Sequence, residues 1–272
     1  PMNTLHRTIL SLIAAAIVIV GHAGGASRPV VPAAQDRQAL APTGKLRVGV
    51  YPGSPTSLVK EAPAGEARGV SVDIGKELAR RLGVPYEQVE FPRVAAVLDA
   101  LKAGQVDFTV TNATPARMVD MNFTAPLVEL ELGYLVVPGS RVTSIAEVDQ
   151  PGIKVGVSQG STSQATLSRQ LRNAVVVPAP TLKAAGEMLS DGRVDTFATN
   201  KGILFEMADV VRGAKVLDGR WGQEQLAIAI PKGRDAGMDY VRKFADEVRA
   251  DGLVRRAAER AGLRGTLEAA PR

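Results

Sequence analysis

Hydrophobic and polar positions follow two alternating patterns along the chain, one typical of strands and one typical of helices. Buried-strand patterns occur at 46–50 (LRVGV), 89–91, 106–111, 153–157 (IKVGV) and 194–199. Apolar residues at helical spacing occur at 70–82 and 94–103, and Gly83 and Gly104 follow these segments as C-caps. Alternating strands and helices predict an α/β fold with largely parallel sheets and helices on both faces.

The pattern occurs twice, which indicates two related lobes. The strands at 46–50 and 153–157 both lead into a Gly-Ser pair, at 53–54 and 160–161. A Gly-x-Val-Asp motif occurs at 104–107 and again 88 positions later. In α/β folds ligands bind beyond the carboxyl ends of the strands, so two lobes that face each other would form a ligand cleft.

The N-terminal region reads as a targeting segment. An apolar run of 12 residues at 9–20 follows His6 and Arg7, and it is shorter than the roughly 20 residues that a membrane span needs. We expect a signal peptide over 1–26, with an uncleaved membrane anchor as the alternative. Residues 27–44 are rich in Pro and Ala and aperiodic, which predicts a flexible leader.

The composition limits the kinds of catalytic and metal sites that the chain could form. The chain has no cysteine, and its two histidines, His6 and His22, both lie in the predicted signal peptide. A mature chain without them could form no Ser-His-Asp triad, no Cys-His dyad and no metal site with His or Cys ligands. Aromatic residues make up 4%, and charges are mixed along the chain, which argues against nucleic-acid binding. We therefore expect no catalytic residue, metal or cofactor.

The first candidate site follows the strand at 106–111. Thr114 is placed to cap a helix whose first residue is Pro115, and Arg117 comes within its first turn. Free backbone N–H groups at 112–114 beside a guanidinium would bind a carboxylate or phosphate. The alternative is a surface arginine paired with Asp120.

The second candidate site follows the strand at 153–157, where Ser161 and Thr162 open a helix. Their hydroxyls and N–H groups would hold the other side of an anion, or they are a plain helix cap. Asn200 lies just past the strand at 194–199, so its amide faces a ligand or only completes a turn.

The remaining polar and aromatic candidates are expected to be structural or to line the pocket. Asp107 and Asp195 stand at strand starts, which face away from the cleft, so we interpret them as structural. Tyr51 and Tyr134 are candidates for a pocket wall or for the core. Trp221 is the single tryptophan, and we expect it to pack.

In their order, these motifs resemble the family 3 bacterial extracellular solute-binding proteins, the periplasmic receptors of polar amino-acid ABC importers. The resemblance covers about residues 45–262. It rests on these segments: LRVGV (46–50), GVSVDIGKELARRLG (69–83), LDALKAGQVDF (98–108), TPAR (114–117), FTAP (123–126), KVGVSQGSTSQ (154–164), GRVDTF (192–197), IAIPKG (228–233) and ADGL (250–253).

The resemblance implies a two-lobed type II periplasmic-binding fold and roles for matching residues. Arg117 matches the arginine that pairs with the ligand's α-carboxylate, and the backbone N–H of Asn112 supports it. Thr162, with Ser161, matches the lobe-two loop that contacts the same carboxylate.

The same resemblance places Tyr51 and Ser54 in the first pocket loop, and it exposes departures from the family pattern. The family aspartate that receives the ligand's ammonium group is Asn200 here, so affinity for a free α-amino group should fall. The usual aromatic residue near position 94 is Val94. The segment 107–117 is also about two residues shorter than in the family.

By this resemblance the protein is a periplasmic solute-binding protein that closes around an amino acid or related small carboxylate. We expect a monomer that partners an ABC transporter permease. Lobe one would be 45–129 plus 226–265, lobe two 130–225, and the C-terminal tail 266–272. Chain crossings near 128–133 and 222–228 would form the hinge.

Two alternatives stay open. A periplasmic dehydratase of the cyclohexadienyl type would use the same fold and would need a carboxylic acid in the cleft, for which Glu129 and Glu131 are the nearest candidates by position. A ligand-sensing module for a separate receptor would use the same closure.

Overall fold

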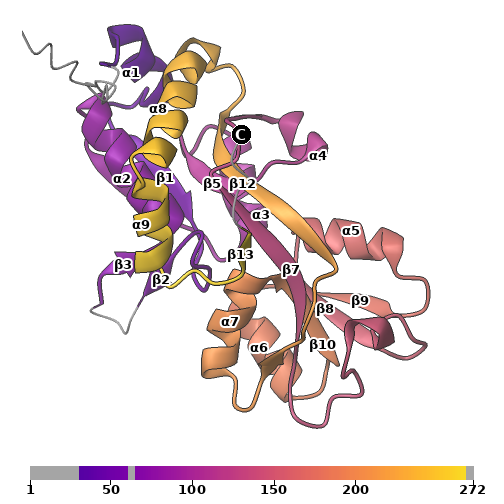
Figure 1. The fold of residues 1–272 in the computed structure, drawn as a ribbon. Helices are drawn as coiled ribbons and strands as arrows, with labels where there is room; N and C mark the ends of the chain where they lie inside the picture. Colours follow the sequence, from indigo (N-terminus) through magenta and orange to yellow (C-terminus); the bar gives the residue numbers. More distant parts are fainter. Residues whose placement is uncertain (1–30, 61–64, 268–272) are drawn as a thin grey trace, which may run out of the picture.

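The computed structural model describes residues 31–60 and 65–267, so the predicted signal peptide lies outside the described residues. Two α/β lobes are joined by two long strands, β7 (Val128–Val136) and β12 (Gly222–Pro231), which run through both lobes (Figure 1). These strands pair antiparallel where they pass from one lobe to the other, with Gly222 opposite Leu132 and Leu226 opposite Val128. The expected two-lobed α/β fold is confirmed, but the expectation of largely parallel sheets is wrong, because β7 and β12 pair antiparallel with their neighbours.

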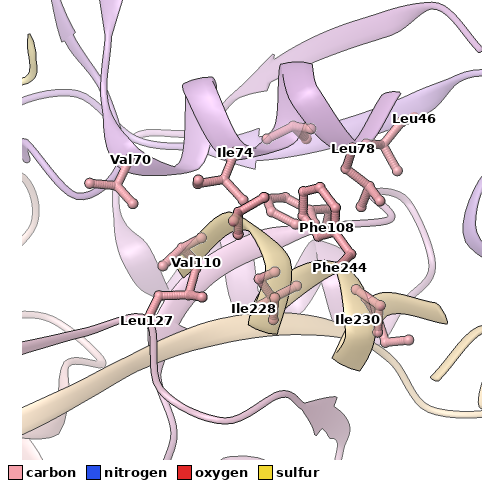
Figure 2. Packing of buried hydrophobic residues seen from close by; sticks show 14 of the residues in the cluster. Leu46, Val70, Ile74, Leu78, Phe108, Val110, Leu127, Ile228, Ile230 and Phe244 are labelled. Atoms are coloured by element: carbon pink, nitrogen blue, oxygen red, sulfur yellow. The ribbon is translucent and has the colours of Figure 1, made fainter. Parts of the chain in front are cut away.

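Lobe one has a sheet with helices on both faces. β1 pairs parallel with β4, and a bridge between Val48 and Phe108 connects β1 to the segment that leads into β5. Helices α2 and α8 bury one face of this sheet (Figure 2), and α3 packs against the other. The elements of this lobe are α1 (Ala34–Leu40), β1 (Leu46–Val50), β2 (Val59–Lys60), β3 (Ala67–Arg68), α2 (Val70–Leu82), β4 (Tyr86–Glu90), α3 (Val94–Lys102), β5 (Thr109–Asn112), α4 (Pro115–Met118), β6 (Met121–Phe123), α8 (Met238–Ala250) and α9 (Leu253–Arg260).

Lobe two repeats this layered plan. β8 lies between β10 and β9 and is parallel to both, while β10 pairs antiparallel with β7. Helix α5 covers one face of the sheet, and α6 and α7 cover the other. The elements are β8 (Lys154–Ser158), α5 (Thr162–Gln170), β9 (Val175–Ala179), α6 (Leu182–Ser190), β10 (Thr196–Asn200), α7 (Lys201–Val210) and β11 (Lys215–Val216).

Helix α2 forms over the residues that its apolar spacing predicts. It ends at Gly83, whose φ of 69° is the left-handed conformation of a C-cap. It begins after Gly69, where a Cβ atom would lie 2.0 Å from the carbonyl oxygen of Ser57. Only glycine fits this approach, which brings the loop after β1 against the start of α2.

The two aspartates of the repeated motif hold equivalent strands. The Oδ2 atom of Asp107 accepts the N–H of Arg47 at 2.9 Å, and Oδ2 of Asp195 accepts the N–H of Lys154 at 2.8 Å. Each carboxylate also pairs with an arginine guanidinium, and that of Asp107 is fully buried. Their expected structural role is confirmed: each carboxylate binds the backbone where β1 or β8 begins.

The expected flexible leader is wrong for the residues that the structure describes. Residues Ala34–Leu40 form helix α1, and Leu40 is 1% exposed. Its side chain lies against Gly237 at the start of α8 and belongs to the core cluster of lobe one. Burial of Leu40, together with Ala41 at 4% exposed, attaches this otherwise aperiodic segment to lobe one.

The expected C-terminal tail is wrong at its first residues. Thr266–Leu267 form strand β13, which pairs antiparallel with β7 opposite Leu130 and Glu129. The chain therefore passes the hinge region a third time (Figure 1). Within the described ranges, no helix has the length and apolar character needed to cross a membrane.

Replacing Leu40 tests whether α1 is part of lobe one. Leu40→Ala should lower the free energy of unfolding by about 2–5 kcal/mol because it leaves a cavity in the core. The control Val31→Ala removes a side chain that is 85% exposed and should change stability by less than about 0.5 kcal/mol. Denaturant unfolding measures both, and equal stability of the two variants would contradict the packing of α1.

Candidate functional site

Arg117 extends from α4 into a cavity at the junction of the two lobes. Thr114 caps α4 as predicted, since its hydroxyl accepts the N–H of Arg117 at 3.3 Å, and Pro115 is the first helical residue. The guanidinium Nη1 donates to the Oγ1 atom of Thr111 at 2.9 Å and to the carbonyl of Asn112 at 3.1 Å. These contacts use one nitrogen and fix the plane of the group.

The alternative ion pair with Asp120 is wrong. Asp120 pairs with Lys102 at 2.9 Å, on the exposed side of the lobe. Arg117 instead lines the cavity, and burial lowers its pKa, against the opposing effects of Glu224 and Tyr51. A buried guanidinium without a carboxylate in an ion pair is costly, so the site favours an anionic ligand group.

The lobe-two side of the cavity is the start of α5. Ser161 is its N-cap, and the Oγ atom accepts the N–H of Gln164 at 3.1 Å. Ser161 and Thr162 both line the cavity. The positive end of α5 and Arg117 therefore face the same space, an arrangement that suits a carboxylate.

The lobes touch each other in this structure. The Nδ2 atom of Asn112 donates to the Oγ1 atom of Thr162 at 3.3 Å, which joins lobe one to lobe two. A Cβ atom at Gly160 would lie 2.5 Å from the Cβ of Ala95, and one at Gly53 would lie 3.3 Å from the Cβ of Leu182. Both loops that carry the Gly-Ser pairs thus meet the opposite lobe, and the cleft is closed.

The expected free amides at 112–114 are wrong for Ala113. Its N–H donates to the carbonyl of Gln225 at 2.9 Å because the end of β5 pairs with β12. The side chain of Asn112 is also engaged, since its Oδ1 accepts the N–H of Gln225 at 3.0 Å. Thr114 lines an outer groove and not the cavity.

The first pocket loop contributes Tyr51 but not Ser54. Tyr51 lines the cavity, and burial raises the pKa of its phenol. Ser54 is fully buried behind it, where its hydroxyl shares a hydrogen bond of 2.9 Å with that of Thr56. Tyr134 lies in the core of lobe two, and Trp221 packs against it with ring centroids 6.1 Å apart.

Asn200 lines the cavity, but its amide is already bonded at both ends. Its Oδ1 accepts the N–H of Ile203 at 3.1 Å as the N-cap of α7. Its Nδ2 donates to the Oε1 atom of Glu224 at 2.7 Å. The amide thus makes one hydrogen bond at each end, which leaves the second lone pair of Oδ1 and the second N–H of Nδ2 for a ligand group.

Glu224 is the charged group that the sequence interpretation missed. It lies on β12, is 7% exposed and shares the cavity with Arg117. Burial raises the pKa of its carboxyl, while hydrogen bonds from Asn200 and Thr162 and the charge of Arg117 oppose that shift. Along β12 a period of two puts Glu224 on the same face as Leu226 and Ile228, a signal that was present in the sequence.

The carboxylates considered for an enzyme lie elsewhere. Glu129 accepts a hydrogen bond from the side chain of Gln225 at 3.1 Å, and Glu131 pairs with Lys201 and Arg220. Neither lines the cavity. Further lining residues that the sequence interpretation did not single out are Thr56, Val110, Thr111, Ser158, Ser163, Thr199, Ile203 and Leu226.

Comparison with known proteins agrees with this architecture. Residues 46–262 match the model of the bacterial extracellular solute-binding proteins, family 3. The ABC transporter glutamine-binding protein GlnH of Bacillus subtilis (strain 168) is 25% identical over 198 residues, which are 71% of this chain and 72% of that protein.

Two solved structures with the same fold have a sequence identity to this chain similar to that of GlnH. An ancestral arginine-binding protein bound to glutamine has a TM-score of 0.71 and 26% identity, and the match covers 79% of this chain and 96% of the other. The ancestral amino acid-binding protein AncCDT-1, a precursor of cyclohexadienyl dehydratase, has a TM-score of 0.71 and 25% identity, over 84% and 98%. From the family match over most of its length, this chain belongs to the family 3 bacterial extracellular solute-binding proteins.

Proposed function

We propose that this protein binds a free amino acid by closing its two lobes around it and presents the closed form to an ABC transporter. The observation that carries the proposal is the guanidinium of Arg117 in a cavity where the two lobes meet. Relatives named for glutamine or arginine binding support an α-amino acid as the ligand class.

The ligand carboxylate would bridge Arg117 and the start of α5, so both lobes hold one group. A ligand that binds the closed form more tightly shifts the population toward that form. The motion would bend β7 and β12 at their paired segment, with lobe one as α1, 45–129 and 226–265, and lobe two as 130–225.

Location and partners follow from the family. Members of this family are extracellular or periplasmic, and we infer a periplasmic location reached through the N-terminal segment at 1–26. The partner would be the permease of an amino-acid importer. The protein would bind the permease as a monomer with its lobes closed.

Binding is favoured over catalysis by the relatives, which are named for glutamine or arginine binding, and the one acid in the described cavity lining is Glu224. Glu129 and Glu131, the candidates for a dehydratase acid, are both engaged outside the cavity. The related ancestral protein AncCDT-1 is an amino acid-binding protein and a precursor of cyclohexadienyl dehydratase.

Removing Arg117 tests the anchor. Arg117→Ala should weaken binding of L-glutamine or L-arginine by about 2–5 kcal/mol because the ligand carboxylate loses its buried partner, about 30- to several-thousand-fold in Kd. Titration calorimetry measures the change, with Arg169→Ala in the outer groove as the control. Unchanged affinity in the Arg117 variant, or equal losses in both variants, would contradict the anchor.

Filling the contact between Ala95 and Gly160 tests closure separately from ligand contacts. Ala95→Leu should oppose the closed form, since the added atoms overlap Gly160. Overpacking costs about 1–3 kcal/mol, so affinity should fall about 5- to 150-fold. Ala103→Leu, at the exposed end of α3, is the control. Thermal unfolding of the unliganded protein should be unchanged, and wild-type affinity in the Ala95 variant would contradict binding by closure.

A further inference from the structure

The cavity contains two opposite charges. Among its described lining residues, Glu224 is the only acid and Arg117 the only base. They influence each other electrostatically, yet no ion pair joins them among the described residues. A carboxylate buried without a counter-ion is unfavourable, and a ligand cation would relieve it.

Glu224 is held in place by neighbours from several elements. Asn200, at the end of β10, donates to its Oε1 atom at 2.7 Å. Thr162, whose hydroxyl accepts a hydrogen bond from Asn112 across the lobes, also acts to lower the pKa of the Glu224 carboxyl. Glu224 and the contact between the lobes therefore share Thr162 as a neighbour.

Asn200 cannot replace this charge. Its oxygen caps α7 and its nitrogen donates to Glu224. The amide carries no net charge, so it does not neutralise an ammonium group. What it supplies is a hydrogen bond that orients the carboxylate.

Building on the proposed function, we propose that Glu224 pairs with the α-ammonium group of the ligand and that Asn200 is its positioning residue. The negative charge of the site lies on the hinge strand β12, and a hydrogen bond links it to Asn200 at the end of β10. One positive and one negative group in the cavity then match a zwitterion. A carboxylate that lacks the α-amino group would leave Glu224 unpaired.

Substitution of Glu224 measures this pairing. The probes are L-glutamine and 4-carbamoylbutanoate, the analogue with hydrogen in place of the α-amino group, and in parallel L-arginine and 5-guanidinopentanoate. Glu224→Gln should weaken binding of the amino acids about 30- to several-thousand-fold. It should leave Kd for the des-amino analogues unchanged or lower, so that discrimination between the two classes is lost.

A charge exchange tests the role of the pair more strictly. The double variant Asn200→Asp with Glu224→Gln keeps one carboxylate and one amide in contact and reverses their order. It should recover at least tenfold of the amino-acid affinity that Glu224→Gln loses. A residue that only supports the fold would show no such recovery.

Controls separate the possible failures. Glu129→Gln, the same change on the neighbouring hinge strand, should leave binding unchanged, and thermal unfolding of unliganded Glu224→Gln should match or exceed wild type because a buried charge is removed. Wild-type amino-acid affinity in Glu224→Gln, or equal loss for amino acids and des-amino analogues, would overturn the inference while leaving Arg117 as the anchor. Absence of amino-acid binding by the wild type, in contrast, would overturn the proposed function and this inference together.

Discussion

A cavity that holds one guanidinium and one carboxylate apart from each other is the feature on which the site depends. Arg117 and Glu224 come from different elements, α4 and the hinge strand β12; Glu224 is buried and Arg117 is partly buried. Buried charges without partners destabilise a fold, so the arrangement is favourable only when complementary charges enter. A zwitterionic ligand supplies both, and this gives a physical reason for closure around it.

The lobes show how a repeated local plan places such a site. Asp107 and Asp195 bind the backbone at the starts of β1 and β8 in the same way. Each of these strands then leads to a loop whose glycine, Gly53 or Gly160, touches the opposite lobe. The strand starts are thereby fixed, while the carboxyl ends carry the groups that face the ligand.

The fold was largely predictable because its signals are local. Helix α2 begins and ends where its apolar spacing and its flanking glycine predict. Helix α1 was missed because burial of Leu40 attaches it to lobe one through contacts with α8, about 200 positions later in the chain. The pairing of β13 with β7 is equally non-local, and two residues carry no readable pattern of their own.

The site was predictable only where a motif marks it. Arg117 and Thr162 follow recognisable turns and line the cavity as expected. Thr114 stands in the same segment as Arg117, and Ser54 belongs to the Gly-Ser pair of lobe one. Their hydroxyls, however, make local hydrogen bonds. Glu224 is marked only by the two-residue period of β12, which places it on the apolar face. Its contact with Asn200 is set by tertiary pairing and has no local signal.

The most direct measurement is a crystal structure of the protein with its amino acid bound. The ligand carboxylate should lie within hydrogen-bond distance of the Arg117 guanidinium and the ammonium nitrogen within hydrogen-bond distance of the Glu224 carboxylate, with the lobes closed. A bound ligand whose carboxylate lies away from Arg117, or whose ammonium lies away from Glu224, would contradict these roles.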